Sequence, residues 1–353
     1  MQRAESVWKE IRGREDFIDA RLRSPAPELA PEQFDRERLA QWKAQMQWPE
    51  MQEFFRLMRE AARRPAAVPE RDSSQGYVTE TGLLNPLFAA VQFSGAKAWL
   101  AAKEGNQSEA AEDVLTTARL ASFGLRHDFL LGWMIGVSFD QMAIGTAQSV
   151  IAELPAGSFR MQEWQALDDL WARHAAEARA DLVRTMDGER VLLGMCFFER
   201  VLAGRISLGQ EIAKSANVMP SDEAGLARWI GGLYQTALAP LLVSDYAAYL
   251  RLMVSVREVL SNGQTGQAKE ESFLRSVPRW ALLARTAAPS YDGLPRLLEE
   301  YEVNLQLARL GLALEDFRFA RSKVSGFVAG PRAPGSEDHR PFHRPAVHLP
   351  HRE

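Results

Sequence analysis

Apolar residues recur every three or four positions over most of residues 84–323, and this spacing predicts a series of amphipathic helices. The expected helices cover residues 84–103, 107–123 and 128–153, a longer stretch that begins near residue 161, and residues 297–321. No segment of residues 1–323 alternates between apolar and polar positions as a half-buried strand does. The pattern therefore predicts an all-α fold built from antiparallel helix pairs.

The turn between the first two of these helices carries a stop signal and a start signal. Gly105 is placed to cap the end of one helix, and Asn106 with Glu109 three residues later forms a capping box for the next. Both helices are rich in alanine, whose small side chain lets antiparallel helices approach closely. The pair is expected to resemble a single tetratricopeptide-type unit, although no regular repeat follows along the chain.

The two ends of the chain differ from this helical middle. Residues 1–74 are polar and broken by prolines, so we expect a loosely attached arm with short helices near residues 4–20 and 35–63, followed by a linker. Residues 75–323 are expected to form the main helical domain. Residues 324–353 are rich in Pro, Gly, Arg and His without a helical period, which predicts a disordered tail.

Two residues are expected to interrupt helices within the main domain. Gly188 is placed to break the long helix before a second apolar segment at residues 190–204. Pro240 is placed to divide or kink a helix over residues 223–262, because proline cannot donate the backbone hydrogen bond.

The composition excludes several classes of protein. Apolar residues make up 46% of the chain, as in a globular protein. A net charge of −4 argues against nucleic acid as a main partner, since phosphate binding needs a basic face. The single Cys196 excludes an intrachain disulfide. The first residues lack the apolar core of a signal peptide, and residues 129–151 contain Asp140, so we expect a buried helix there and no membrane span.

Four carboxylates are the candidates for a catalytic centre. Asp140 lies inside an apolar helix, where a carboxylate either serves chemistry or pairs with an arginine of a neighbouring helix. Asp181, Asp187 and Glu189 form a charged run with two arginines, which suits either a carboxylate-driven hydrolase or, as we favour, a solvated helix face with ion pairs. The chain carries no phosphate loop, dinucleotide fingerprint or nucleophile elbow, and no cofactor is predicted.

The histidines predict no metal site. His127 precedes Asp128, which is expected to cap the next helix. His174 lies on an apolar stripe, where we expect a hydrogen-bonded core histidine. A metal needs ligands held in a fixed geometry, and the remaining histidines lie in a tail that has no core to hold them: His339, His343, His348 and His351.

The tail has an explanation in its coding frame. Codons for Val324 to Val328 can be chosen so that a frame shifted by one base reads Tyr-Pro-Asp-Ser-Leu. The shifted frame continues to the codon of Pro350 as a coherent segment with turn residues and spaced apolar positions. We therefore hypothesise that residues 324–353 are an out-of-frame tail.

Four segments carry a resemblance to a known family: residues 96–121, the expected turn at residues 186–190, residues 244–253 and residues 307–321. They are similar to an uncharacterised family of all-helical bacterial proteins. In that family a Tyr-Pro segment follows the last helix. The shifted frame supplies this segment, which also resembles the C-terminal part of the major pseudopilin of type II secretion. Family members often carry an N-terminal hydrophobic anchor, which implies an envelope location. This chain lacks such an anchor, so either it departs from the family pattern or its start lies upstream of Met1. The resemblance implies no established activity.

The function predicted from these observations is that of a non-enzymatic binding or scaffold protein. Its expected partner is a protein or peptide, since stacked helix pairs form extended apolar grooves. The alternative is a helical enzyme with a buried carboxylate centre around Asp140, or around Asp181, Asp187 and Glu189. Such an enzyme needs a concave pocket in which these carboxylates converge with an arginine or a metal.

Overall fold

The computed structural model describes most of the chain, and every regular element that it describes is a helix. The described ranges are residues 2–14, 36–64, 81–154, 162–205, 239–262, 273–281 and 291–328, with a few shorter pieces of one or two residues between them. No strand occurs within these ranges. The predicted all-α fold is therefore confirmed.

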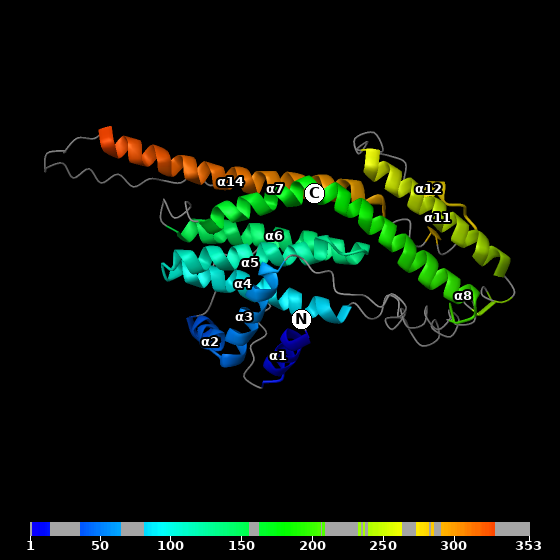
Figure 1. Ribbon diagram of the computed structural model, residues 1–353, viewed down its shortest axis with the longest axis horizontal. Coiled ribbons are helices and arrows are strands. Elements are labelled where there is room, and N and C mark those ends of the chain that lie inside the picture. The colour runs from blue at the N-terminus through cyan, green and yellow to red at the C-terminus, as the bar shows by residue number, and fades with distance from the viewer. Residues whose placement is uncertain are drawn as a thin grey trace.

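The helices lie side by side in layers, as Figure 1 shows. The N-terminal layer contains α1 (Gln2–Arg12), α2 (Arg36–Met46) and α3 (Pro49–Arg63). The middle layer contains α4 (Thr81–Lys103), α5 (Gln107–Leu125) and α6 (Leu130–Glu153). On the far side lie α7 (Gln162–Glu189), which continues as the π-helix η4 (Arg190–Glu199) and α8 (Arg200–Leu202), together with α11 (Ala239–Asn262), α12 (Phe273–Ser276) and α14 (Leu294–Val328).

A large apolar core joins the middle layer to the far layer. It contains side chains of α4, α5, α6, α7, α11 and α14, among which Trp133, Trp171 and Tyr249 are almost fully buried. Burial of one large apolar side chain stabilises a fold by about 1.5–3 kcal/mol. Because α6 lies within this core, the apolar stretch at residues 129–151 is a buried helix, as expected. Among the described residues, no helix has the length and apolar character needed to cross a bilayer.

Helices α5 and α6 cross at two glycines. A Cβ atom built on Gly136 would lie 2.3 Å from the backbone nitrogen of Leu125, and one built on Gly124 would lie 2.5 Å from the Cα atom of Gly136. Real Cβ atoms do not approach other heavy atoms this closely, so both positions need glycine. The absence of both side chains sets the distance between the two helices.

The N-terminal arm is docked on the middle layer, which corrects the expectation that it is loosely attached. Trp8 of α1 contacts Phe54 of α3 and Phe93 of α4, with ring centroids 5.4 and 5.6 Å apart. A second apolar core contains these rings and extends to Phe139 of α6. Apolar side chains at helical spacing within a polar segment thus anchor the described part of the arm. Most of the predicted linker lies in residues 65–80, outside the described residues.

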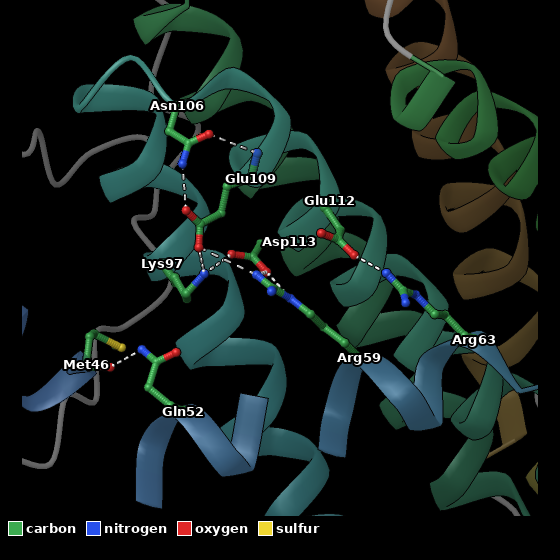
Figure 2. Close-up of polar contacts among 9 residues, drawn as sticks. All are labelled: Met46, Gln52, Arg59, Arg63, Lys97, Asn106, Glu109, Glu112 and Asp113. Carbon is green, nitrogen blue, oxygen red and sulfur yellow. Dashed lines mark hydrogen bonds and ion pairs between the residues drawn. The ribbon is translucent and has the colours of Figure 1, made fainter. Parts of the chain in front are cut away.

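A buried ionic cluster reinforces this docking (Figure 2). Asp113 of α5 is almost fully buried and accepts hydrogen bonds from Lys97 of α4 at 2.8 Å and from Arg59 of α3 at 2.9 Å. Glu109 contacts both cations. A buried carboxylate requires partners of this kind, because an unpaired buried charge is strongly destabilising. Three helices therefore meet at one set of charges.

The predicted turn between α4 and α5 is confirmed. Gly105 has a positive φ of 78°, and the backbone N–H of Asn106 donates to the carbonyl oxygen of Ala101 at 2.8 Å. Asn106 Oδ1 accepts from the backbone N–H of Glu109 at 3.4 Å, while the Glu109 carboxylate accepts from the Asn106 side-chain amide at 2.7 Å (Figure 2). The two helices are antiparallel across this turn. The tetratricopeptide character of the pair stays a prediction.

The predicted break at Gly188 is wrong, because α7 runs through it to Glu189 and continues into η4. A Cβ atom on Gly188 would lie 1.8 Å from the carbonyl oxygen of Asp128. The glycine therefore serves a close contact with the α5–α6 connection and does not end a helix. The expected turn at residues 186–190 is, for the same reason, continuous helix.

One other boundary also differs from expectation. The predicted division at Pro240 stays a prediction, because α11 begins at Ala239 with the proline in its first turn, where proline is tolerated, and most of residues 223–238 lie outside the described residues. Helix α14 is longer at both ends than predicted and includes Val324 to Val328, the first residues of the expected tail. Residues 329–353, with the four tail histidines, lie outside the described residues. The predicted frame shift and the domain boundaries stay predictions.

Candidate functional site

The four predicted carboxylates do not form one centre. Asp187 lies on the surface and pairs with Arg257 at 3.2 Å. Glu189 is buried and accepts from the backbone N–H of Leu130 at 3.1 Å. It therefore supplies the cap of α6 that was expected from Asp128, and burial raises the pKa of its carboxyl group above the ordinary value.

Asp181 only partly matches the expectation that it lies on a solvent-exposed helix face with ion pairs. It forms the predicted ion pair with Arg184, three residues away, at 3.0 Å. However, its side chain is mostly buried, and this burial raises the pKa of its carboxyl group, opposed by the charge of Arg184. Asp181 is close enough to His174 to interact with it electrostatically.

Asp140 lies at the centre of a buried polar network. It is fully buried, and its Oδ2 atom accepts hydrogen bonds from His174 Nδ1 at 2.7 Å and from the Tyr301 hydroxyl at 2.6 Å. The groups belong to α6, α7 and α14. Burial raises the pKa of Tyr301 well above its ordinary value, and the negative charge of Asp140 raises it further, so this hydroxyl stays a donor. His174 is thus the hydrogen-bonded core histidine that was expected, and Asp140 pairs with histidine and tyrosine in place of an arginine.

The network continues from His174 to Ser122 of α5. Ser122 Oγ lies 2.8 Å from His174 Nε2. His174 Nδ1 donates to the carboxylate, and in the tautomer with its proton on Nδ1 the other nitrogen, Nε2, accepts from the serine hydroxyl. A chain of hydrogen bonds therefore runs from Tyr301 through Asp140 and His174 to Ser122.

At its Ser122 end, this row of hydrogen bonds reaches a cavity of about 350 Å³ between α3, α5 and α7. This volume is within the range of small-molecule sites. Ser122 and His174 both line it, together with one glutamate, Glu177, and five arginines: Arg63, Arg64, Arg119, Arg126 and Arg173. The lining therefore carries a clear excess of positive charge.

Two of these arginines have no anionic partner in the described part of the chain. Arg63 and Arg64 pair with glutamates, and Arg126 lies 3.6 Å from Glu177. Arg119 and Arg173 form no ion pair with any described residue. Burial lowers the pKa of Arg119, and the charges of Arg63 and Arg173 lower it further, opposed by the charge of Glu112. Cations held close together in this way favour the binding of an anion.

Sequence reasoning did not single out Ser122, Tyr301 or the arginines of this cavity. One signal was present: Arg119, Ser122 and Arg126 are spaced by three and four residues, which places them on one face of a helix. Among the described residues, no group of histidine, cysteine and carboxylate side chains is arranged to hold a metal ion. The candidate site consists of the hydrogen-bonded network and the arginines around the cavity.

A second feature is an apolar stripe along α14. Five large apolar side chains point away from the core, each with half or more of its area exposed: Val303, Leu307, Leu310, Leu314 and Phe317. The opposite side of the same helix packs into the core through residues that include Leu298, Leu305 and Leu312. Helix α14 is therefore apolar on two sides, and only one of them is covered by described residues.

Comparison with family models, curated proteins and solved structures finds no match for this chain. The resemblance to a family of helical bacterial proteins, with its N-terminal anchor, stays a prediction.

Proposed function

We propose that this protein is a helical scaffold that assembles through α14, and that the partner helix belongs to a second copy of the chain. The observation that supports this proposal is the exposed stripe from Val303 to Phe317. A single exposed leucine is common on protein surfaces, but a continuous apolar row on one helix is typical of a protein interface.

The spacing of the stripe favours a helix as the partner. Its five residues follow one another at intervals of four, three, four and three, which is the spacing of the a and d positions of a coiled coil. The positions beside the middle of the stripe are small or neutral, namely Gln306, Gly311 and Ala313. They allow a second helix to approach closely and place no like charges against each other when two copies pair.

The charges at the two ends of the stripe favour an antiparallel arrangement. Glu299, Glu300 and Glu302 precede it, and Arg318 and Arg321 follow it. In an antiparallel pair centred on Leu310, the acidic end of each helix lies beside the basic end of the other. In a parallel pair, like charges meet at both ends, which is unfavourable.

The area of the stripe is sufficient for a specific dimer. It leaves on the order of 500 Å² of apolar surface uncovered, near the upper end of what a monomeric protein exposes in one patch. Pairing two copies removes about 1,000 Å² from water, which is the lower bound for a specific interface.

The test is the mass of the protein in solution. Sedimentation equilibrium of the wild-type chain at micromolar concentration is expected to give a dimer. The double variant Leu307→Glu and Leu314→Glu is expected to be monomeric with an unchanged helical circular dichroism spectrum, because each substitution places a charge in the paired stripe.

The matched control carries the same change on another helix. Val243 and Val254 of α11 are also exposed apolar residues, and the variant with glutamate at both positions is expected to remain dimeric. A monomeric wild-type chain at about 100 μM, where an interface of this size would assemble, or a stripe variant that keeps the wild-type mass, would contradict the proposal.

A further inference from the structure

The hydroxyl group of Ser122 is directed differently from four other hydroxyls in the described helices. Ser138, Ser149, Thr117 and Thr146 each donate to the carbonyl oxygen four residues earlier, at 2.8 to 3.0 Å. This is the usual bond of a serine or threonine within a helix. Ser122 instead faces His174 Nε2 on a neighbouring helix. Its orientation is therefore set by the imidazole and not by its own helix.

Ser122, His174 and Asp140 have the relations that an activated nucleophile requires. The hydroxyl lies within hydrogen-bond reach of one ring nitrogen, and a carboxylate orients the ring through the other. Tyr301 fixes the carboxylate in turn. Each link is 2.6 to 2.8 Å long, so the chain is already in place without a ligand.

The surroundings of Ser122 fit a negatively charged substrate. Arg119 lies one turn before Ser122 on α5, Arg126 follows the last residue of α5 as its C-cap, and Arg173 lies beside His174 on α7. Ser122 and His174 both line the cavity, so a ligand in the cavity can reach both side chains.

We propose that Ser122 and His174 form the catalytic pair of an esterase site, with Asp140 and Tyr301 as positioning residues, and that the substrate is a carboxylic ester bearing a second, negatively charged group. This activity goes beyond the scaffold function and does not depend on α14 pairing, since none of the stripe residues lines the cavity.

The reaction follows from the positions of these groups. Ser122 Oγ attacks the ester carbonyl carbon while His174 Nε2 takes the hydroxyl proton. The carbon–oxygen bond to the alcohol then breaks, and His174 returns the proton to the leaving alkoxide, so an alcohol departs and an acyl-serine remains. Water, deprotonated by His174, attacks the acyl-serine and releases the acid, and the proton goes back to Ser122 Oγ.

The arginines have two tasks in this reaction. Backbone N–H groups within a helix are already bonded to carbonyl oxygens, so α5 does not offer them to an oxyanion. The cationic side chains of Arg119 and Arg126 supply such donors, because both line the cavity together with Ser122. Arg173, which has no ion pair with a described residue, is assigned to the second anionic group of the substrate.

The experiment compares two chromogenic esters and one covalent probe on the full chain. The anionic ester 4-nitrophenyl hydrogen glutarate is expected to be hydrolysed faster than neutral 4-nitrophenyl acetate. A fluorophosphonate probe is expected to label Ser122, as located by mass spectrometry. The Ser122→Ala variant should lose labelling and about 1,000-fold in kcat/KM, whereas Ser138→Ala, a helix serine outside the cavity, should keep both.

Further variants separate the roles of the other residues. His174→Gln should lower kcat about as far as Ser122→Ala. Asp140→Asn should lower kcat with little change in KM, and it should remove the low-field proton resonance of His174 Nδ1, which Ser122→Ala should retain. Arg173→Gln should raise KM for the anionic ester about 10-fold and leave the neutral ester unchanged.

Several results would overturn the proposal. One is hydrolysis of both esters at the rate of buffer alone with no label on Ser122. Another is labelling that persists in Ser122→Ala. If Ser122→Ala does not fold, Ser122→Cys is the replacement variant, because it keeps the shape of the side chain and a nucleophile. Its cysteine should then react with iodoacetamide faster than the cysteine of Ser138→Cys, and equal rates would also contradict the proposal. Equal rates on the two esters would overturn the assigned substrate class.

Discussion

At the level of single residues, carboxylates that look alike in the sequence have different roles in the fold. The apolar neighbours of Asp140 predicted its burial, because the helical period places it on a core face. Its partners could not be predicted, since His174 and Tyr301 lie 34 and 161 residues further along the chain. Glu189 was expected in a charged run on the surface, yet it caps another helix. Long-range contacts of this kind depend on helix packing, which the local pattern does not specify.

Glu189 gives a pH-dependent prediction. Burial raises the pKa of its carboxyl group in the folded protein, so the folded state binds this proton more tightly than the unfolded state does. The contribution of Glu189 to stability is therefore fully present below the unfolded pKa, near 4.5, and is lost as the pH rises through the higher folded value. Glutamine cannot ionise and keeps a neutral side chain of the same shape.

The stability of the Glu189→Gln variant relative to the wild type should therefore increase as the pH rises. We expect the free energy of unfolding of the variant, minus that of the wild type, to rise between about pH 4 and about pH 8. Urea unfolding of both proteins across this range measures the difference. A difference that stays constant with pH would show that the carboxyl group titrates alike in both states.

At the level of helices, the sequence predicted elements better than it predicted their ends. The stop and start signals at Gly105 and Asn106 were interpreted correctly, because capping depends on neighbouring residues alone. Gly188 was misinterpreted, because a glycine required by a close contact looks the same in the sequence as one that ends a helix. Cavity residues from α3, α5 and α7 converge only once the helices have packed, so no local pattern could assemble the candidate site.

The crossing of α5 and α6 gives a prediction with an internal control. Gly136→Ala places a methyl group against the backbone of α5, which cannot move without shifting the helix, so we expect a loss of about 1–3 kcal/mol in the free energy of unfolding. Gly145 lies in the same helix, and a Cβ atom added there would meet no other atom within 4 Å. Gly145→Ala is expected to be neutral or to stabilise by up to about 1 kcal/mol. Thermal and urea unfolding distinguish the two, and equal effects would argue against the close crossing.

The ionic cluster that docks the arm gives a second prediction at this level. Asp113→Ala leaves Lys97 and Arg59 without their buried partner, so a loss of roughly 3 kcal/mol or more is expected. Glu112, which pairs with Arg63 on the surface, is the control, and Glu112→Ala should cost less than about 1 kcal/mol. Limited proteolysis should also show that α3 is cut faster in Asp113→Ala. Similar stability losses in the two variants would mean that the buried cluster contributes no more than a surface pair.

At the level of the whole molecule, the two proposed activities occupy separate surfaces. The cavity lies between α3, α5 and α7, whereas the apolar stripe lies along α14. Tyr301 connects them, because it belongs to α14 and donates to Asp140. The side of α14 that packs into the core thus holds the proton chain in place, and the other side is left for a partner. Sequence periodicity predicted the helix, but only its packing revealed which of its two apolar sides is covered.

The direction of pairing is the most discriminating property of the proposed dimer. In an antiparallel pair centred on Leu310, residue 303 of one copy lies close to residue 317 of the other, because both are seven residues from the centre. Cysteine introduced at Val303 should therefore form a disulfide with cysteine at Phe317 of a second copy when the two variants are mixed, each with Cys196→Ser. Each variant alone should crosslink poorly, because its two cysteines lie at opposite ends of the interface. A parallel pair would give the reverse result, with each variant crosslinking to itself and no mixed product. The charged residues at the ends of the stripe favour the antiparallel outcome, and raising the salt concentration should weaken that preference by screening them.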